Sequence, residues 1–261
     1  MTLPDTIAPP ERRRVWVWLL PLAAIVVAAL IAAYELIASP FQAMLLANYG
    51  KRLTYASQVG ASDSIRFPAG GPHDIRLGYA RLPAISERLA TRGYGVARQA
   101  RISPEMAKLA DFGLFLPYRE KQAAGLTLLD CAGTPFYQAR FPGRGYADFD
   151  AIPPVIANTL LFIENRELLD PNHPRRNPAV EWDRLAQALL ERAIQVVNPS
   201  RNVPGGSTLA TQIEKYRHSP DGLTMTASDK FIQMASASVR AYLDGADTRA
   251  TRRHIVLDYL N

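Results

Sequence analysis

The pattern of apolar and polar positions divides the chain into an uncharged N-terminal run and a longer series of amphipathic segments. The run covers residues 15–34 and contains no charged side chain. A helix of about twenty residues is needed to cross the hydrocarbon core of a bilayer. Trp16, Trp18 and Tyr34 lie near the two ends of the run, as is typical of aromatic residues at membrane interfaces. We therefore expect a transmembrane helix at residues 15–37.

The charges that flank this run predict its orientation. Three arginines, Arg12 to Arg14, precede it, whereas the far side begins with Glu35 and has no basic residue before Lys51. The positive-inside rule then places residues 1–14 in the cytoplasm and the chain after about residue 38 outside it. A cleaved signal peptide is the alternative, but the apolar run is longer than a typical signal core and Pro40 disfavours cleavage.

The segments that follow predict a stalk and then a small α/β module. Apolar residues at helical spacing in residues 40–59 indicate a helical stalk at residues 38–59. Residues 60–124 change in character and are interpreted as a module of unknown role. Its expected elements are strands at 64–68 and 94–102 and helices at 80–93 and 103–113, the latter capped by Ser103.

The second half of the chain predicts a hairpin followed by helices only. Two strand-like runs at residues 125–142 flank a turn at residues 132–134. Amphipathic patterns bounded by Pro, Gly and Asn then predict an all-α lobe, so that the fold class is mainly α. The expected helices are residues 154–168, 181–197, 207–217, 226–244 and 248–260.

Composition narrows the classes of partner and site. The net charge of +6 is spread along the 261 residues, and an anchored domain outside the cytoplasm seldom meets nucleic acid. Anionic lipid headgroups and a pyrophosphate-bearing substrate are better candidates than nucleic acid for the partners of this positive charge. The single cysteine, Cys131, excludes an internal disulfide and a cysteine-based metal site. The four histidines lack the spacing of metal ligands: His73, His173, His218 and His254.

The first candidate for chemistry is Glu164. It follows the apolar residues 160–163, which would resist ionisation of the carboxylate and so suit a general acid or base. The alternative is a solvated residue at a helix end, because Asn165, Arg166 and Glu167 follow at once.

The second candidate is a glycine pair that precedes a helix. Gly205 and Gly206 allow a ligand to approach the backbone, and Ser207 or Thr208 can cap the helix, whose first amides form an anion site. Lys215 adds a cation about two turns further on. A glycine pair before a capping residue is by itself more often a simple loop-to-helix junction.

The two segments together, LLFIENREL (160–168) and VPGGSTLATQIEK (203–215), resemble the peptidoglycan glycosyltransferase domain, glycosyltransferase family 51. This domain is found in class A penicillin-binding proteins and monofunctional transglycosylases. Two further matches are Lys230, at the lysine of the family's Arg-Lys-x-x-Glu block, and the closing HIVLDYLN (254–261). The resemblance covers residues 125–261 and implies a lysozyme-like all-α domain. The family's domain normally continues beyond its Tyr-Leu-Asn, so this sequence is expected to be either a fragment or a shortened form.

The resemblance implies a reaction and a set of roles. Glu164 would be the general base for attack of an acceptor sugar on lipid II, with lipid pyrophosphate as leaving group. Lys215 and Lys230, joined by Arg217, would hold the pyrophosphate. Candidate substrate-binding residues are Asn165, Gly206, Ser207, Thr208, Gln212, Lys215 and Lys230. In the family, Mg²⁺ can bridge the pyrophosphate, but no ligand residue is assigned here.

Several family positions are changed in this chain. Asn165 stands where an aspartate is usual, Leu168 where a phenylalanine is usual, and Asp229 where an arginine is usual. Gln233 replaces the second catalytic glutamate, and an amide cannot act as a base. The basic, proline-rich loop at residues 170–178 must contact substrate differently from the family's loop.

Three functions remain open at this point. The first is a glycosyltransferase that polymerises lipid II at the outer, periplasmic face of a bacterial inner membrane, alongside cell-wall synthesis proteins. The second is a catalytically impaired relative that acts as a cell-wall scaffold or glycan-binding protein, which the changes at Asn165 and Gln233 favour. The third is a lysozyme-like hydrolase or lytic transglycosylase, which needs no pyrophosphate site and so no Lys215 or Lys230.

Overall fold

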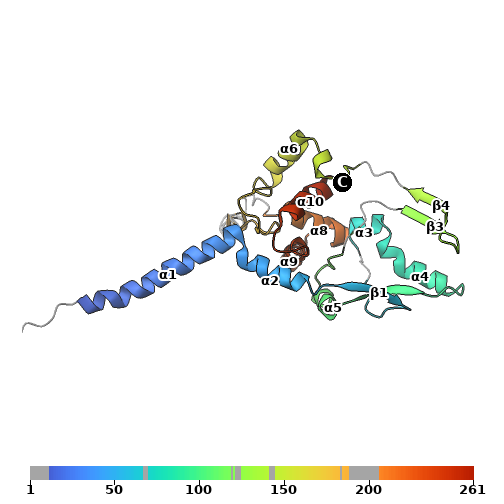
Figure 1. Ribbon diagram of the computed structural model, residues 1–261, viewed down its shortest axis with the longest axis horizontal. Coiled ribbons are helices and arrows are strands. Elements are labelled where there is room, and N and C mark those ends of the chain that lie inside the picture. Colours follow the sequence, from blue (N-terminus) through green and yellow to red (C-terminus); the bar gives the residue numbers. More distant parts are fainter. Residues whose placement is uncertain are drawn as a thin grey trace, which may run out of the picture.

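The computed structural model describes residues 12–66, 70–118, 120, 125–140, 145–182, 184–187 and 206–261. The fold is mainly α, with 55% helix and 9% strand, as the sequence predicted. A single long helix projects from a helical body, and a smaller part with two short β-ribbons lies on the opposite side of that body (Figure 1).

The projecting helix is α1 (Arg12–Ala38). Its segment Leu19–Ala38 is long and apolar enough to cross a membrane, and its large apolar side chains are exposed. Length and apolar composition near an N-terminus are weak evidence for a membrane anchor, since a signal sequence has both. The predicted helix at residues 15–37 is therefore confirmed as a helix, while its orientation stays a prediction.

The stalk prediction is only partly correct. Helix α2 (Pro40–Gly50) follows α1, but the chain then turns and forms strand β1 (Tyr55–Val59), so the helix does not reach residue 59. All five residues of β1 are exposed, which leaves no alternation of apolar and polar positions to reveal the strand. Strand β1 exists because it pairs with another strand.

Its partner is β2 (Arg98–Ile102), which lies within the predicted strand 94–102. The two strands are antiparallel, with Tyr55 opposite Ile102 and Val59 opposite Arg98. The strand predicted at 64–68 is wrong over its described residues, 64–66, which are not in a strand. Strand β2 pairs with β1 instead.

The helices of the small module agree better with the sequence pattern. Helix α4 (Leu82–Ala90) and helix α5 (Pro104–Asp111) fall within the predicted ranges, and the Ser103 hydroxyl caps α5 by accepting from the Met106 amide. The sequence pattern missed the short helix α3 (Pro72–Arg76) and did not separate the 3-10 turn η1 (Tyr79–Arg81) from the helix predicted at 80–93. The predicted hairpin is confirmed as β3 (Gly125–Leu129) and β4 (Pro135–Arg140), which pair antiparallel.

The helical body begins after the hairpin with a 3-10 turn, η2 (Phe149–Ala151), and helix α6 (Pro154–Glu164). It continues with α8 (Leu209–His218), the turn η3 (Pro220–Gly222), α9 (Ala227–Ala241) and α10 (Arg249–Leu260). Of the predicted helix 181–197, residues 182 and 184–187 are helical, and most of the remainder lies outside the described residues.

The main core lies among α6, α8, α9 and α10. Leu168, at the position where the resemblance leads us to expect a phenylalanine, is buried in it at 3% exposure. Helix α2 packs its small residues Ala43 and Ala47 against Ala241 and Tyr242 at the end of α9. The main core contains Ile152, Ala157, Leu161, Leu168, Ala179, Val180, Leu209, Ala210, Ala237, Ile255, Val256 and Leu257.

The small module is joined to the helical body at one very close approach. A Cβ atom at Gly71 would lie 1.7 Å from the carbonyl oxygen of Arg217, so only glycine allows the start of α3 to meet the end of α8. This contact brings His73 and Arg76 of α3 beside the helices of the candidate site.

Candidate functional site

Glu164 is the last residue of α6, which Pro154 begins at its first turn. Its carboxylate Oε2 accepts a hydrogen bond from the side-chain amide of Gln212 at 2.9 Å. Its main-chain carbonyl accepts from the guanidinium of Arg184, which also pairs with Glu181 at 2.9 Å. Helix α8 therefore orients the carboxylate of Glu164, while Arg184 anchors the end of α6.

The apolar residues before Glu164 do not enclose its carboxylate. Phe162 is 63% exposed and Ile163 is 66% exposed, and the guanidinium of Arg166 stacks on the Phe162 ring at 4.1 Å. Glu164 itself is half-buried and lines a cavity of about 310 Å³ formed by residues 162–167, Glu181 and Arg184. The environment expected from the apolar sequence around Glu164 is thus only partly present, and the carboxylate is open to a ligand.

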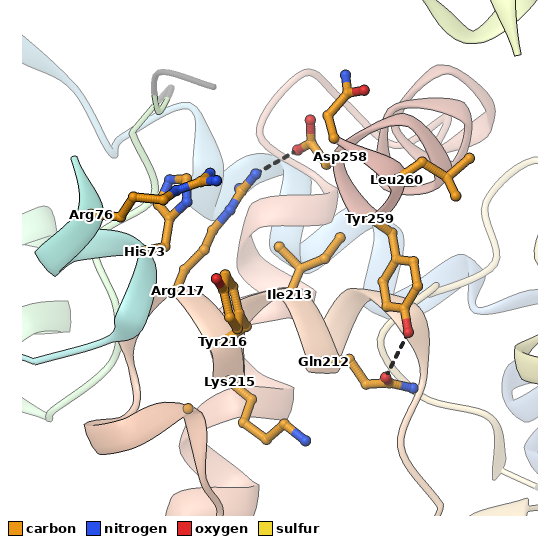
Figure 2. A pocket seen from close by; sticks show the side chains of 12 residues that line it. His73, Arg76, Gln212, Ile213, Lys215, Tyr216, Arg217, Asp258, Tyr259 and Leu260 are labelled. Atoms are coloured by element: carbon orange, nitrogen blue, oxygen red, sulfur yellow. Dashed lines mark hydrogen bonds and ion pairs between the residues drawn. The ribbon is translucent and has the colours of Figure 1, made fainter. Parts of the chain in front are cut away.

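Gln212 joins Glu164 to a second and larger cavity. The Tyr259 hydroxyl donates to Gln212 Oε1 at 3.3 Å (Figure 2). Because the Gln212 amide nitrogen donates to Glu164, one amide contacts both groups. The cavity has a volume of about 580 Å³ and lies between α8, α10 and α3. Burial raises the pKa of Tyr259, and the charge of Glu164 raises it further, which keeps the hydroxyl protonated as a donor.

Helix α8 begins with the cap that the sequence allowed. Thr208 is the N-cap, because its hydroxyl accepts from the Thr211 amide at 3.3 Å while Thr211 Oγ1 accepts from the Thr208 amide at 2.9 Å. Thr208 is 1% exposed and its hydroxyl also donates to the carbonyl of Ala179. Its side chain is therefore used to build the helix start. Gly206 and Ser207 precede it and are half-buried, and Gly205 lies outside the described residues.

Two lysines from different helices interact electrostatically, and one of them contacts Ser207. The ammonium group of Lys230, on α9, donates to the Ser207 hydroxyl. Burial lowers the pKa of Lys230, and the charge of Lys215, on α8, lowers it further. Such mutual repulsion between cations is relieved when an anion binds. Lys215 also lines the larger cavity, and Figure 2 shows its side chain extending away from Arg217 and Asp258.

Arg217 was expected to help hold the pyrophosphate, but its side chain forms ion pairs within the protein instead. Its guanidinium pairs with Asp258 at 3.1 Å and with Glu120 at 3.2 Å, and the residue is 9% exposed. These two carboxylates satisfy much of its charge. Arg217 thus holds α8 against α10 and against the segment that contains Glu120.

A buried network of charges continues from Arg217 behind the cavity. His218 contacts Asp74 at 3.1 Å and Glu120 at 2.8 Å. Burial alone would lower the pKa of His218, but its hydrogen bonds to these carboxylates and the charge of Glu214 raise it to about 9. Burial alone would raise the pKa of Glu120, but its bond to His218 and the neighbouring guanidinium groups lower it to about 2. This network ties the small module to α8.

Two of the positions at which this chain departs from the resembling family, Asn165 and Gln233, are buried. Asn165 is 3% exposed and forms the C-cap of α6. Gln233 is 1% exposed, and its amide oxygen accepts from Thr224 at 2.9 Å while its amide nitrogen donates to Ser219 at 2.9 Å. The Gln233 side chain therefore links α9 to the turn after α8 and faces its own chain.

The loop at residues 170–178 is tied to α10. Arg252 is 1% exposed and donates to the carbonyls of Leu168, Asp170 and His173 at 3.0 to 3.1 Å. The Thr248 hydroxyl donates to the Arg176 carbonyl at 2.8 Å. These hydrogen bonds from Arg252 and Thr248 fix the position of the loop relative to α10.

Sequence reasoning missed Tyr259, Arg184 and Arg252. Tyr259 lay within the closing HIVLDYLN match, which was the only signal for it, and the other two carried no signal beyond their charge. Within the part of the chain that the structure describes, no group of three or more His, Cys, Asp or Glu side chains is placed to hold a metal ion.

Comparison with known proteins indicates the family to which this part of the chain belongs. A family model described as Transglycosylase matches residues 133–261, which contain Glu164, the α8 segment and the closing Tyr-Leu-Asn. Comparison with curated proteins and with solved structures gave no match. Enzymes of this family are transferases of peptidoglycan synthesis and are membrane-associated. The chain therefore carries, at residues 133–261, a domain of the peptidoglycan transglycosylase family.

Proposed function

We propose that the protein is a membrane-anchored peptidoglycan glycosyltransferase that polymerises lipid II into glycan strands. The observation that carries the proposal is the orientation of the Glu164 carboxylate by Gln212, at the rim of an open cavity. A carboxylate held at one oxygen leaves the other free to accept a proton from a substrate hydroxyl.

In the proposed reaction, Glu164 removes the proton from the 4-hydroxyl of the acceptor sugar. That oxygen forms a bond to the anomeric carbon of the donor while the bond to the lipid pyrophosphate breaks. The pyrophosphate leaves with the electron pair, and configuration at the anomeric carbon is inverted. The proton stays on Glu164 until solvent removes it.

The cationic part of the site is assigned to Lys215 and Lys230. Their repulsion makes this position favourable for the two negative charges of a pyrophosphate. Ser207 accepts from Lys230 and so positions its ammonium group. Gly206 precedes it and allows close approach of the substrate to the backbone. Asn165, Thr208 and Gln233 are assigned to the support of these residues, because their side chains are buried.

The position of the enzyme follows from α1. We infer that α1 spans the bacterial inner membrane with Arg12 to Arg14 on the cytoplasmic side, and that the catalytic domain lies on the periplasmic side. An anchor of this kind keeps the site within reach of a substrate whose lipid tail stays in the bilayer.

The test is polymerisation of fluorescent lipid II by the full chain in vesicles, read as glycan polymer on a gel. Glu164→Gln is expected to lower the rate by roughly a hundredfold or more. Glu87→Gln is the matched control, because Glu87 is exposed on α4 in the small module. Polymer formed equally by Glu164→Gln and the native chain would remove Glu164 from the role of base.

One observation favours a second candidate, a catalytically impaired relative that binds glycan or cell-wall enzymes. The resemblance places Gln233 at the family's second glutamate, and its amide accepts from Thr224 and donates to Ser219. Gln233→Glu separates the two candidates. Polymer from Gln233→Glu but not from the native chain, together with lipid II binding by both, would favour the impaired relative.

A further inference from the structure

A pocket of about 600 Å³ lies in the angle between α1 and α2, away from the site described above. Its walls are mostly apolar and include Ile31 and Tyr34 of α1 with Phe41 and Met44 of α2. Residue Arg175 and the segment 245–246 of the helical body close the third side. Figure 1 shows that α1 and α2 meet at a sharp bend where α1 joins the rest of the molecule.

The bend is a built feature of the fold. Ser39 has a left-handed backbone conformation, with φ of 52°, and is 1% exposed. The carboxylate of Glu35 accepts from the amides of Phe41 and Gln42 at 2.8 and 2.9 Å, which caps α2 from the preceding helix. The backbone amide of Asn177 donates to the Ser39 hydroxyl at 3.2 Å and joins the bend to the helical body.

Helix α2 presents a second apolar face outward. Its Ala43 and Ala47 pack on α9, whereas Phe41, Met44 and Leu45 are 57%, 51% and 50% exposed. Adjacent exposed apolar residues of this size mark an interaction surface. This face is continuous with the exposed apolar surface of α1. Contact with the hydrocarbon region of a membrane would therefore cover both surfaces.

The charges at the pocket select among apolar partners. Lys51 and Arg175 are exposed and line the pocket. Among the described residues that line it, Glu35 is the only carboxylate, and it already accepts from two backbone amides. Two cations beside an apolar pocket match a ligand with an anionic head and a hydrocarbon chain. A peptide or a second copy of the chain would not need this arrangement.

We propose that the α1–α2 pocket binds an acyl chain of an anionic phospholipid from the adjacent leaflet, with its phosphate held by Lys51 and Arg175. Helix α2 then lies in the membrane interface and sets the tilt of the domain relative to the bilayer. This inference rests on the membrane anchoring in the proposed function, but it does not depend on lipid II or on Glu164.

The first experiment measures contact between α2 and lipid. The full chain carries Cys131→Ser, which removes the exposed native thiol, and a single fluorophore at Met44→Cys. The control carries the fluorophore at Tyr94→Cys, because Tyr94 is 66% exposed and comes four residues after α4 in the sequence. Helix α4 lies on the opposite side of the molecule from α1 (Figure 1). In vesicles with nitroxide-labelled phospholipid, the Met44 label is expected to be quenched and the Tyr94 label is not. Equal quenching of the two labels would overturn the proposal.

The second experiment measures the headgroup contact by native mass spectrometry of the full chain released from vesicles of phosphatidylglycerol and phosphatidylcholine. Lys51→Gln with Arg175→Gln is expected to reduce retained phosphatidylglycerol by about fivefold for each charge removed. Arg88→Gln with Arg92→Gln removes two exposed charges near α4 and is expected to leave retention unchanged. The proposal would be contradicted if both double variants retained as much phosphatidylglycerol as the native chain. It would also be contradicted if both lost phosphatidylglycerol to the same extent.

These readouts distinguish failure of the inference from failure of the proposed function. Quenching at Met44 without any glycan polymer would keep the lipid site and remove the enzyme. Polymer formation without quenching at Met44 would support the enzyme and rule out the lipid site. A chain that does not float with vesicles would remove the membrane anchor, and with it the lipid site.

Discussion

The side-chain amide nitrogen of Gln212 donates to the carboxylate oxygen Oε2 of Glu164 at 2.9 Å, across 48 positions of sequence. Helix α8 therefore orients the end of α6, and Tyr259 in turn contacts Gln212 from α10. Three helices of the main core converge on one carboxylate in this way. If the proposed reaction holds, Gln212 is a positioning residue for the base.

Replacing Gln212 is expected to affect turnover more than substrate affinity. A hydrogen bond to a charged group contributes about 1.5 kcal/mol or more, so Gln212→Ala is expected to lower kcat roughly tenfold with little change in KM. Steady-state kinetics with lipid II provide the measurement. Tyr259→Phe removes only the 3.3 Å contact and should have a smaller effect. A native kcat in Gln212→Ala would show that the contact does not support the reaction.

The two lysines are expected to titrate as a coupled pair. Burial and the charge of Lys215 lower the pKa of Lys230, so the Lys230 ammonium loses its proton at lower pH than an ordinary lysine. Lys215→Met removes the repulsion and is expected to raise the pKa of Lys230. The measurement is an NMR titration of labelled lysine side chains.

The matched control for this pair is Lys108→Met, because Lys108 is exposed on α5. Binding of a pyrophosphate-bearing lipid should weaken as pH rises through the pKa of Lys230, and this loss should move to higher pH in Lys215→Met. An unchanged titration of Lys230 in Lys215→Met would mean that the two cations do not interact.

The buried histidine network predicts a loss of stability at alkaline pH. The folded pKa of His218 is about 9, above its ordinary value of 6.5. Stabilisation from protonated His218 is therefore present below about pH 6.5 and is lost as pH rises through about 9, by at most about 3 kcal/mol. Asp74, Glu120 and Glu214 are the acidic groups that face it.

The check is the urea midpoint of the full chain in detergent between about pH 6 and about pH 10. His218→Gln should lower the midpoint at neutral pH and flatten its alkaline decline. His254→Gln changes an exposed histidine on α10 and should leave the profile as it is. An alkaline decline that persists unchanged in His218→Gln would assign it to another group.

The junction of the small module with α8 is expected to tolerate only glycine at position 71. Its Cβ would lie 1.7 Å from the Arg217 carbonyl oxygen, so Gly71→Ala must displace α3 from α8. The expected loss is more than about 3 kcal/mol of stability, because backbone atoms cannot move aside as a side chain can. Thermal unfolding measures it. Gly95→Ala has nothing within 4 Å and should unfold like the native chain; equal Tm values for both variants would contradict the contact.

Much of the helical framework was determined by local sequence. The length of the apolar run gives α1, Pro154 begins α6, and Ser103 and Thr208 cap α5 and α8. These features depend on residues within one or two turns of each other, so they can be inferred from spacing alone. The same motifs led to the family that the match at residues 133–261 supports.

Only the tertiary structure decided the rest. Strand β1 carries no apolar alternation and forms because β2, some forty positions away, supplies its hydrogen bonds. Gln212 reaches Glu164, and Gln233 turns to Ser219 and Thr224, only because the core sets the distances between α6, α8 and α9. Contacts between residues distant in sequence depend on how whole elements pack, and no local pattern encodes that packing.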